Sequence, residues 1–213
     1  MLAQIFTSFL SNLGWIVLLF VAITLVKLFK PFLKGKIGEF AVSTHVKVYL
    51  DKENYILLND CTLPDAQNQT TQIDHILLSL YGVFVIETKN YKGWIFGGER
   101  QKIYKKSYKF QNPLHQNYKH QKVLESVLTD IVDSTQIHSI VVFMSDCEFK
   151  TKMPNNVFRG AGWTDYVKQF KQINIPPMKL KRIQYRLEKE ILEKSWKTNR
   201  QHIQSLKDKY TEK

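Results

Sequence analysis

The run from Met1 to Val26 carries no charged side chain, and it limits the possible folds more than any other feature of the sequence. From about residue 5 to residue 26 it is long enough to cross a bilayer as one helix. By the positive-inside rule, the lysines that follow hold the C-terminal side in the cytoplasm. They are Lys27, Lys30, Lys34 and Lys36. A cleaved signal peptide has a basic start and a shorter apolar core, and this run has neither. We therefore expect a single-pass anchor in the cell membrane; a cleaved signal and an apolar helix buried in the domain are the alternatives.

The remaining length leaves room for one further domain. We divide the chain into an anchor and linker (1–34), an α/β core (35–145) and a helical C-terminal extension (146–213). The formal net charge of +12 favours polyanionic partners such as nucleic acid or anionic lipid. General attraction to the cytoplasmic leaflet is the alternative explanation of that charge. Two cysteines form neither a disulfide framework nor a zinc-binding spacing, so a reducing compartment is expected.

Hydrophobic periodicity and turn residues place the other elements in the order helix, strands, helix, strand, helices. A linker at Pro31 and Gly35 separates the anchor from the domain in this prediction. The predicted helices are 36–50, 112–132, a short one capped at Thr164-Asp165, and 179 to about 209; the predicted strands are 55–58, two runs on either side of Tyr81-Gly82, 94–96 and 137–144; residues 60–71 are predicted to be a loop. This order is typical of an α/β domain built around a mixed sheet.

The two strands around Tyr81-Gly82 carry ionisable residues in apolar surroundings, which is costly unless they are paired or bind a metal. Alternate strand residues face the same side, so Glu87 and Lys89 point the same way. If Tyr81-Gly82 is a two-residue loop, Asp74 lies opposite Lys89 and diagonal to Glu87, roughly 7–8 Å away. Two carboxylates at that separation can bind one Mg²⁺ or Mn²⁺ ion, and the lysine lies beside it. A salt bridge between Asp74 and Lys89 near a sheet edge explains the same pattern.

Several motifs together resemble the nuclease-related domain family, NERD. They are Gly35-Lys-Ile-Gly38-Glu39, Gln72-Ile-Asp74-His75-Ile-Leu-Leu, Gly82-Val-Phe-Val-Ile-Glu87-Thr-Lys89-Asn90-Tyr-Lys-Gly93 and Asn112-Pro113-Leu-His-Gln116. The resemblance covers about residues 35–145 and implies a sheet core similar to the restriction-endonuclease-like PD-(D/E)xK nucleases. It implies that Asp74 and Glu87 bind the metal and that Lys89 is the catalytic lysine. Glu39 then matches an added acidic residue, and Gln116 a polar residue that positions phosphate. Ile73 stands where the strict motif has proline.

Three polar residues, Asn112, Gln116 and His120, are spaced one helical turn apart after the sheet. They can face the site together, or they can form a solvated helix face with a local cap at Asn112. We interpret His120 as part of a solvated face and leave Gln116 open. His75 follows Asp74 and points to the other face of the sheet, where we expect a packed histidine.

The segment from Lys102 to Phe110 alternates lysines with aromatic residues, a pattern that suits a nucleic-acid backbone and exposed bases. The lysines are Lys102, Lys105, Lys106 and Lys109. A half-buried edge strand blunted by lysines has the same appearance. For the basic C-terminal helix we favour packing or a coiled coil over binding.

Three functions remain open. The first is a membrane-anchored, metal-dependent nuclease that hydrolyses phosphodiester bonds, with DNA as the expected substrate. The second is a catalytically weak module that binds nucleic acid at the membrane. The third is a structural membrane protein whose charged triad is only a set of salt bridges. The intact Asp74, Glu87 and Lys89 favour the first.

Overall fold

A computed structural model of the chain describes residues 2–65, 67, 69–98, 104–105, 108–144 and 146–193. Of residues 2–13, 104–105 and 108–109 it describes the backbone but not the side chains. The chain divides into two compact units, Met1–Ile37 and Gly38–Lys213. Each unit is described by itself.

The first helix, α1 (Leu2–Tyr49), runs through Pro31 without interruption. The predicted linker residues Pro31 and Gly35 are therefore helical, and the two compact units divide after Ile37. A proline inside a helix removes one backbone hydrogen bond and costs about 3 kcal/mol, a cost that the intact turns on either side can outweigh. The stretch Gly14–Tyr49 contains an apolar window that is long enough to cross a membrane and that is not buried. A membrane span and a signal sequence both fit this window.

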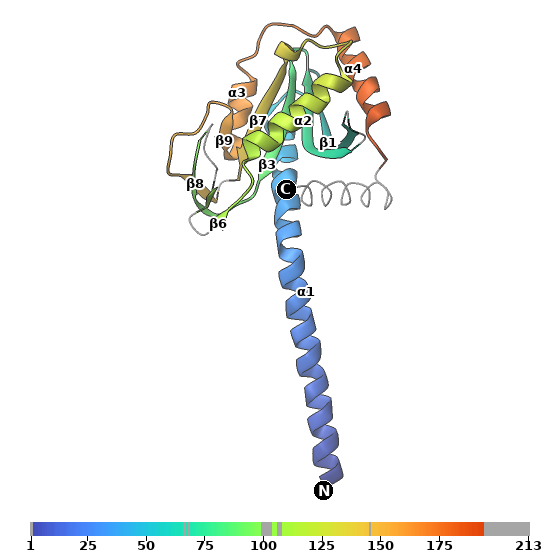
Figure 1. The fold of residues 1–213 in the computed structure, drawn as a ribbon, viewed down its shortest axis with the longest axis vertical. Coiled ribbons are helices and arrows are strands. Elements are labelled where there is room, and N and C mark those ends of the chain that lie inside the picture. The colour runs from blue at the N-terminus through green and yellow to red at the C-terminus, as the bar shows by residue number, and fades with distance from the viewer. Residues whose placement is uncertain are drawn as a thin grey trace. The chain divides into compact units, whose positions relative to one another are not determined.

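The second unit is built around a mixed five-stranded sheet with the strand order β1-β2-β3-β7-β9 (Figure 1). The strands are β1 (Tyr55–Pro64), β2 (Thr70–Ser79), β3 (Val83–Lys89), β7 (Ile137–Phe143) and β9 (Val157–Arg159). The pairs β1–β2 and β2–β3 are antiparallel, while β7 runs parallel to both β3 and β9. The helix α2 (Pro113–Val127) lies in the connection between β3 and β7. The predicted α/β fold with a mixed sheet flanked by helices is confirmed.

A small second sheet has the order β6-β5-β4-β8. Its strands are β4 (Gly93–Phe96), β5 (Tyr104–Lys105), β6 (Tyr108–Lys109) and β8 (Cys147–Phe149). The remaining elements are the short 3-10 helices η1 (Ser134–Gln136) and η2 (Gly160–Gly162), then α3 (Trp163–Val167) and α4 (Pro177–Glu190).

Helices cover both faces of the five-stranded sheet. On one face, side chains of α2 and α4 such as Leu124 and Ile183 pack against Val83 and Val85 of β3. On the other face, Val42 of α1 and Trp163 of α3 belong to the cluster that contains Phe84 and Ile86. The odd-numbered residues of β3 therefore face α2, and the even-numbered residues face α1 and α3.

The β2–β3 hairpin differs from the predicted one by two residues. Leu78, rather than Leu80, pairs with Val83, and residues 79–82 form the turn. The hydroxyl of Ser79 accepts hydrogen bonds from the backbone N–H groups of Tyr81 and Gly82 and donates one to the carbonyl of Gly82. This serine closes a longer turn than the two-residue loop that we expected. Because the shift is an even number, every side chain keeps its face.

Two element boundaries follow contacts between distant segments. β1 continues into the predicted loop 60–71 as far as Pro64, because Cys61 and Leu63 alternate into the core opposite β2. The last helix ends at Glu190 instead of continuing toward residue 209. After Ile191 takes an extended conformation, the N–H of Leu192 donates to the carbonyl of Thr62 on β1. Residues 194–213 lie outside the described part of the chain.

Candidate active site

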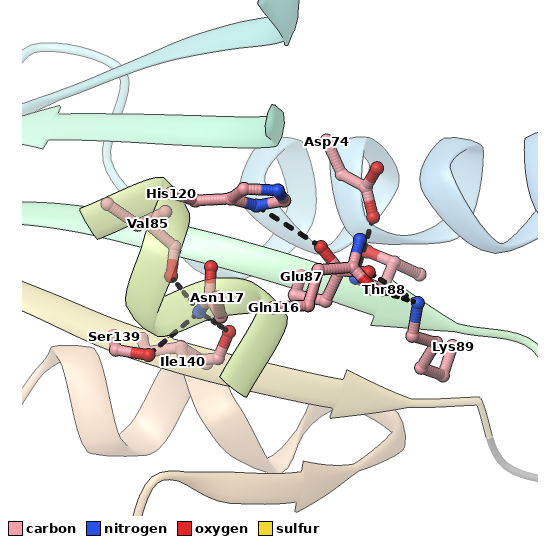
Figure 2. A network of polar contacts seen from close by, with 10 residues as sticks. All are labelled: Asp74, Val85, Glu87, Thr88, Lys89, Gln116, Asn117, His120, Ser139 and Ile140. Atoms are coloured by element: carbon pink, nitrogen blue, oxygen red, sulfur yellow. Dashed lines mark hydrogen bonds and ion pairs between the residues drawn. The ribbon is translucent and has the colours of Figure 1, made fainter. Parts of the chain in front are cut away.

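Asp74 and Glu87 meet on the α2 face of the sheet (Figure 2). The last regular pair between β2 and β3 is His75 with Ile86, and one further step places Asp74 across from Glu87. Our prediction that Asp74 lies opposite Lys89 is therefore wrong by two positions. One Asp74 oxygen, Oδ2, accepts a hydrogen bond of 2.8 Å from the backbone N–H of Thr88, which orients the carboxylate.

Lys89 pairs with Glu87 and not with Asp74. Its ammonium nitrogen lies 2.5 Å from Oε1 of Glu87 and donates to Oε1 of Gln116 at 3.0 Å. The side chains of Lys89 and Glu87 are only 17% and 1% exposed. The alternative that we considered, an Asp74–Lys89 salt bridge, is not formed; Lys89 pairs with Glu87 instead, since both side chains project from the same strand two residues apart.

A second Glu-x-Lys sequence shows why burial matters here. Lys150 forms an ion pair with Glu148, and β8 carries that glutamate. Those side chains are 33% and 54% exposed. Exposed pairs of this kind contribute about 0–1 kcal/mol, whereas removal of one partner from a buried pair leaves a charge without compensation. The same three-residue pattern therefore has different consequences at the two places.

With both carboxyl groups ionised, the buried group would hold two negative charges against one positive charge. Burial raises the pKa of Asp74 to about 8; the charge of Glu87 adds to this, while the Thr88 N–H and Lys89 oppose it. Burial also raises the pKa of Glu87 above its ordinary value, and the opposing effect of Lys89 offsets only part of this rise. Burial by itself lowers the pKa of Lys89, but Glu87 and then Asp74 outweigh it, so the pKa stands above its usual value. One lysine faces two carboxylates, which favours an added proton or cation.

Helix α2 brings two further side chains to these carboxylates. Gln116 contacts Lys89 as described, and Nδ1 of His120 lies 3.4 Å from Oε2 of Glu87. His120 is 4% exposed, so our interpretation of it as part of a solvated face is wrong. Asn112 caps the helix, as its sequence context suggested, by accepting a hydrogen bond from the N–H of Leu114.

Sequence reasoning missed Asn117, which is fully buried and attaches α2 to the sheet. Its amide nitrogen, with two N–H bonds, lies within hydrogen-bond distance of three acceptors: the carbonyls of Val85 on β3 and Ile140 on β7 and the hydroxyl of Ser139 (Figure 2). A signal was available in the sequence: Asn117 falls on the stripe of α2 that also contains Pro113, His120 and Leu124, the buried residues of this helix. A polar residue on a buried stripe requires specific partners.

The part of α1 around Gly38 and Glu39 lies near the same region. The charge of Glu39 raises the pKa values of both Asp74 and Glu87, so its carboxylate lies within electrostatic reach of the pair. One residue earlier, an added Cβ at Gly38 would lie 3.1 Å from Cβ of Asn90 and 3.2 Å from Cγ2 of Thr88. Glycine at this position allows the helix to pack directly on the end of β3.

The other predicted residues lie elsewhere. His75 is buried on the opposite face and its Nδ1 lies 2.7 Å from Oδ1 of Asn59, as expected for a packed histidine. Lys102 and Lys106 lie outside the described residues. For Lys105 and Lys109 only the backbone is described, in β5 and β6.

The donor set fits a divalent ion bound by two carboxylates. Among the described residues, Oε2 of Glu87 is a buried oxygen without a hydrogen-bond partner. In the same part of the chain, no three His, Cys, Asp or Glu side chains are grouped so that they could hold one ion. Mg²⁺ commonly uses one or two carboxylates and completes its shell with water and substrate phosphate. Asp74 and Glu87 meet that requirement, and Lys89 occupies only one of the Glu87 oxygens.

Comparisons with known proteins identify the family of the chain. Residues 34–144 match the profile of the family described as Nuclease-related domain. A protein of Bacillus anthracis, described as uncharacterized, is 41% identical over 132 residues. The aligned part is 60% of this chain and 60% of the relative's own length. No solved structure matches the chain.

Proposed function

Because the chain belongs to the nuclease-related domain family, we propose that it is a membrane-anchored nuclease that hydrolyses phosphodiester bonds with Mg²⁺ or Mn²⁺. The observation that carries this proposal is the imbalance of charge on the α2 face of the sheet. Two buried carboxyl groups, Asp74 and Glu87, lie near one lysine, and Oε2 of Glu87, 3.4 Å from Nδ1 of His120, has no hydrogen-bond partner among the described residues. A structural salt bridge requires neither feature.

In this proposal Asp74 and Glu87 hold the ion, which supplies Lewis-acid activation of a water molecule and of a phosphoryl oxygen. Lys89 stabilises the negative charge that develops on the phosphate, because its ammonium group is held beside the carboxylates in a water-poor position. Gln116 orients that ammonium group through its side-chain carbonyl. Glu39 adds negative charge at the same end of the sheet and so favours a bound cation.

The proposed substrate is nucleic acid, and DNA is the expected one. The formal net charge of +12 supports a polyanionic partner. The segment with Lys102, Lys105, Lys106 and Lys109 supplies the binding surface in this proposal.

Residues 5–26 anchor the chain in the cell membrane in this proposal, and the lysines after Val26 keep the domain in the cytoplasm. Protease protection of the domain in intact spheroplasts, with cleavage only after lysis, supports this orientation; cleavage from outside would contradict it.

The test of cleavage uses the full chain in detergent micelles with end-labelled DNA and RNA of one sequence. Each is incubated with Mg²⁺, Mn²⁺ or EDTA. We expect cleavage that requires the divalent ion and that is lost in Lys89→Ala. The matched control is Lys150→Ala, which removes the lysine of the exposed Glu-x-Lys pair and should cleave like the wild type.

A catalytically weak binding module is the second candidate. The Glu87–Lys89 ion pair at 2.5 Å favours it, because a lysine satisfied by its own strand neighbour can serve structure alone. Salt-sensitive binding of nucleic acid without cleavage under any metal condition would select this candidate. Absence of both binding and cleavage would leave only a structural role for the charged residues.

A further inference from the structure

A pocket with an aromatic interior and a basic rim lies at the other end of β3 from Lys89. Its volume is about 290 Å³. The lining residues come from three places in the sequence: the end of α1 with the turn and the first residue of β1 that follow it, the β2–β3 turn, and the segment after α3. They are Tyr49, Leu50, Asp51, Asn54, Tyr55, Tyr81, Lys168, Phe170 and Lys171, and we call this the tyrosine–lysine pocket. The length of β3 separates it from the candidate active site by about 23 Å, at roughly 3.3 Å per residue.

Aromatic rings form much of the wall. The rings of Tyr55 and Tyr81 lie 5.9 Å apart between centroids and are tilted by 48°. Tyr49 is 48% exposed, which leaves ring surface open to solvent. Burial, followed by Tyr81 and Asp51, raises the pKa of Tyr55 to about 12, so its phenol remains a hydrogen-bond donor at neutral pH. Exposed aromatic faces of this kind are suited to stacking against a planar ring.

Positive charge lies at the rim. Nζ of Lys168 is 6.0 Å from the centroid of the Tyr49 ring, and its contact with Asp165 is a long 3.9 Å at an exposed position. Lys171 is exposed and has no ion pair with any residue that the structure describes. The acidic residue of the lining, Asp51, accepts hydrogen bonds from the N–H of Glu53 and the side-chain amide of Asn54. The two lysines are therefore available to an anion.

We propose that the tyrosine–lysine pocket binds one nucleotide, with the base against the tyrosine rings and the phosphate at Lys168 and Lys171. The volume is at the small end of the range for ligand sites, about 300–1,000 Å³, which suits a single nucleotide and excludes a duplex. A phosphotyrosine ligand combines an aromatic ring and a phosphate too, but such ligands are recognised by arginine clusters, and the lining contains no arginine. A free nucleotide and the end of a single strand share the proposed chemistry. The site does not depend on phosphodiester cleavage.

The test measures binding of adenosine monophosphate to the full chain in micelles by titration calorimetry, with EDTA present so that no metal-dependent reaction occurs. Adenosine and ribose 5-phosphate probe the base and the phosphate separately. We expect each to bind at least roughly ten-fold more weakly than adenosine monophosphate, because base stacking and charge both contribute. A 5′-phosphorylated deoxyadenosine tetranucleotide distinguishes the two candidate ligands, the end of a single strand and a free nucleotide. Affinity more than ten-fold above that of the mononucleotide indicates a strand end, and equal or lower affinity indicates a free nucleotide.

Two separate variants, Tyr49→Ala and Lys171→Gln, should each weaken binding of adenosine monophosphate by roughly five-fold or more. Both positions are exposed, so thermal unfolding should be unchanged. The matched controls are Tyr185→Ala and Lys181→Gln on the exposed side of α4. Equal affinity in the wild type and both pocket variants would overturn the proposal, as would tighter binding of phosphotyrosine than of the nucleotide. Loss of binding in Glu87→Gln would place the nucleotide at the candidate active site instead and would also overturn it.

Discussion

Nδ1 of His120 lies 3.4 Å from Oε2 of Glu87, and both side chains are almost completely buried. The histidine belongs to α2 and the glutamate to β3, so the contact exists only because the helix packs across the sheet. Lys89 contacts the other oxygen of the same carboxylate. The two oxygens of Glu87 therefore differ: Oε1 is bonded to Lys89, whereas Oε2 lies near His120 without a hydrogen bond to any described residue.

Removal of either carboxylate should remove divalent-ion binding. Asp74→Asn and Glu87→Gln each leave one carboxylate, which does not hold a hydrated Mg²⁺ well. Calorimetric titration of Mn²⁺ into the folded variants should show at least a ten-fold weaker association than in the wild type. Glu148→Gln, at the exposed pair, is the control and should bind normally. Equal Mn²⁺ binding by the wild type and Asp74→Asn would rule out the metal site.

Lys89 should separate metal binding from cleavage. Lys89→Ala is expected to keep Mn²⁺ binding and to lose cleavage by about 10²–10³-fold, because a positioned donor acts on the charge of the transition state. Gln116→Leu should lose less, since the lysine remains and only its orientation is weakened. Single-turnover rates at saturating Mn²⁺ provide the measurement. A Lys89→Ala variant with an unchanged rate would contradict the assignment.

The pH dependence of stability should report the buried Asp74 in metal-free protein. Its pKa is about 8 in the folded state and 3.8 in the reference state, so the folded protein keeps a proton that the unfolded chain has lost. This group's contribution to stability is complete below about pH 4 and is lost as the pH rises through 8. The melting temperature of Asp74→Asn minus that of the wild type, both measured in EDTA, should therefore increase as the pH rises from 5 to 8. Parallel curves for the two proteins would contradict this.

Asn117 should matter for the docking of α2. Asn117→Ala removes the donor that joins the helix to β3 and β7, and we expect a loss of about 1–3 kcal/mol in the free energy of unfolding. The exposed Asn155 is the matched control, and Asn155→Ala should change stability by less than about 0.5 kcal/mol. Denaturant unfolding measures both. A stable Asn117→Ala variant with normal cleavage would show that apolar packing alone positions the helix.

The basic segment should account for part of the salt dependence of nucleic-acid binding. Substitution of Gln for all four lysines, Lys102, Lys105, Lys106 and Lys109, removes up to four phosphate contacts. The slope of log affinity against log salt should then flatten by up to about 0.9 per contact on duplex DNA. Fluorescence anisotropy at several salt concentrations measures the slope. If the slope does not change, the contact surface lies elsewhere on the protein.

Local periodicity made several features predictable. The uncharged run to Val26, the start of α2 at Asn112-Pro113 and the strand around Ile140 all depend on side chains close in sequence. The same is true of the shared face of Asp74, Glu87 and Lys89, because a strand alternates with a period of two whatever its neighbours are. A register shift by two residues does not change that face. The three residues therefore lie on one face in the observed register as well as in the predicted one.

What the tertiary structure decided depends on contacts between distant segments. The Ser79 hydroxyl closes a longer turn, and this sets which residue of β3 lies across from Asp74. Docking of α2 through Asn117 buries His120, which an isolated helix would expose to water. The chain leaves the last helix at Ile191 because Leu192 bonds to β1. Periodicity determined which side each residue faces, whereas the free energy of packing and hydrogen bonding between segments determined what it meets there.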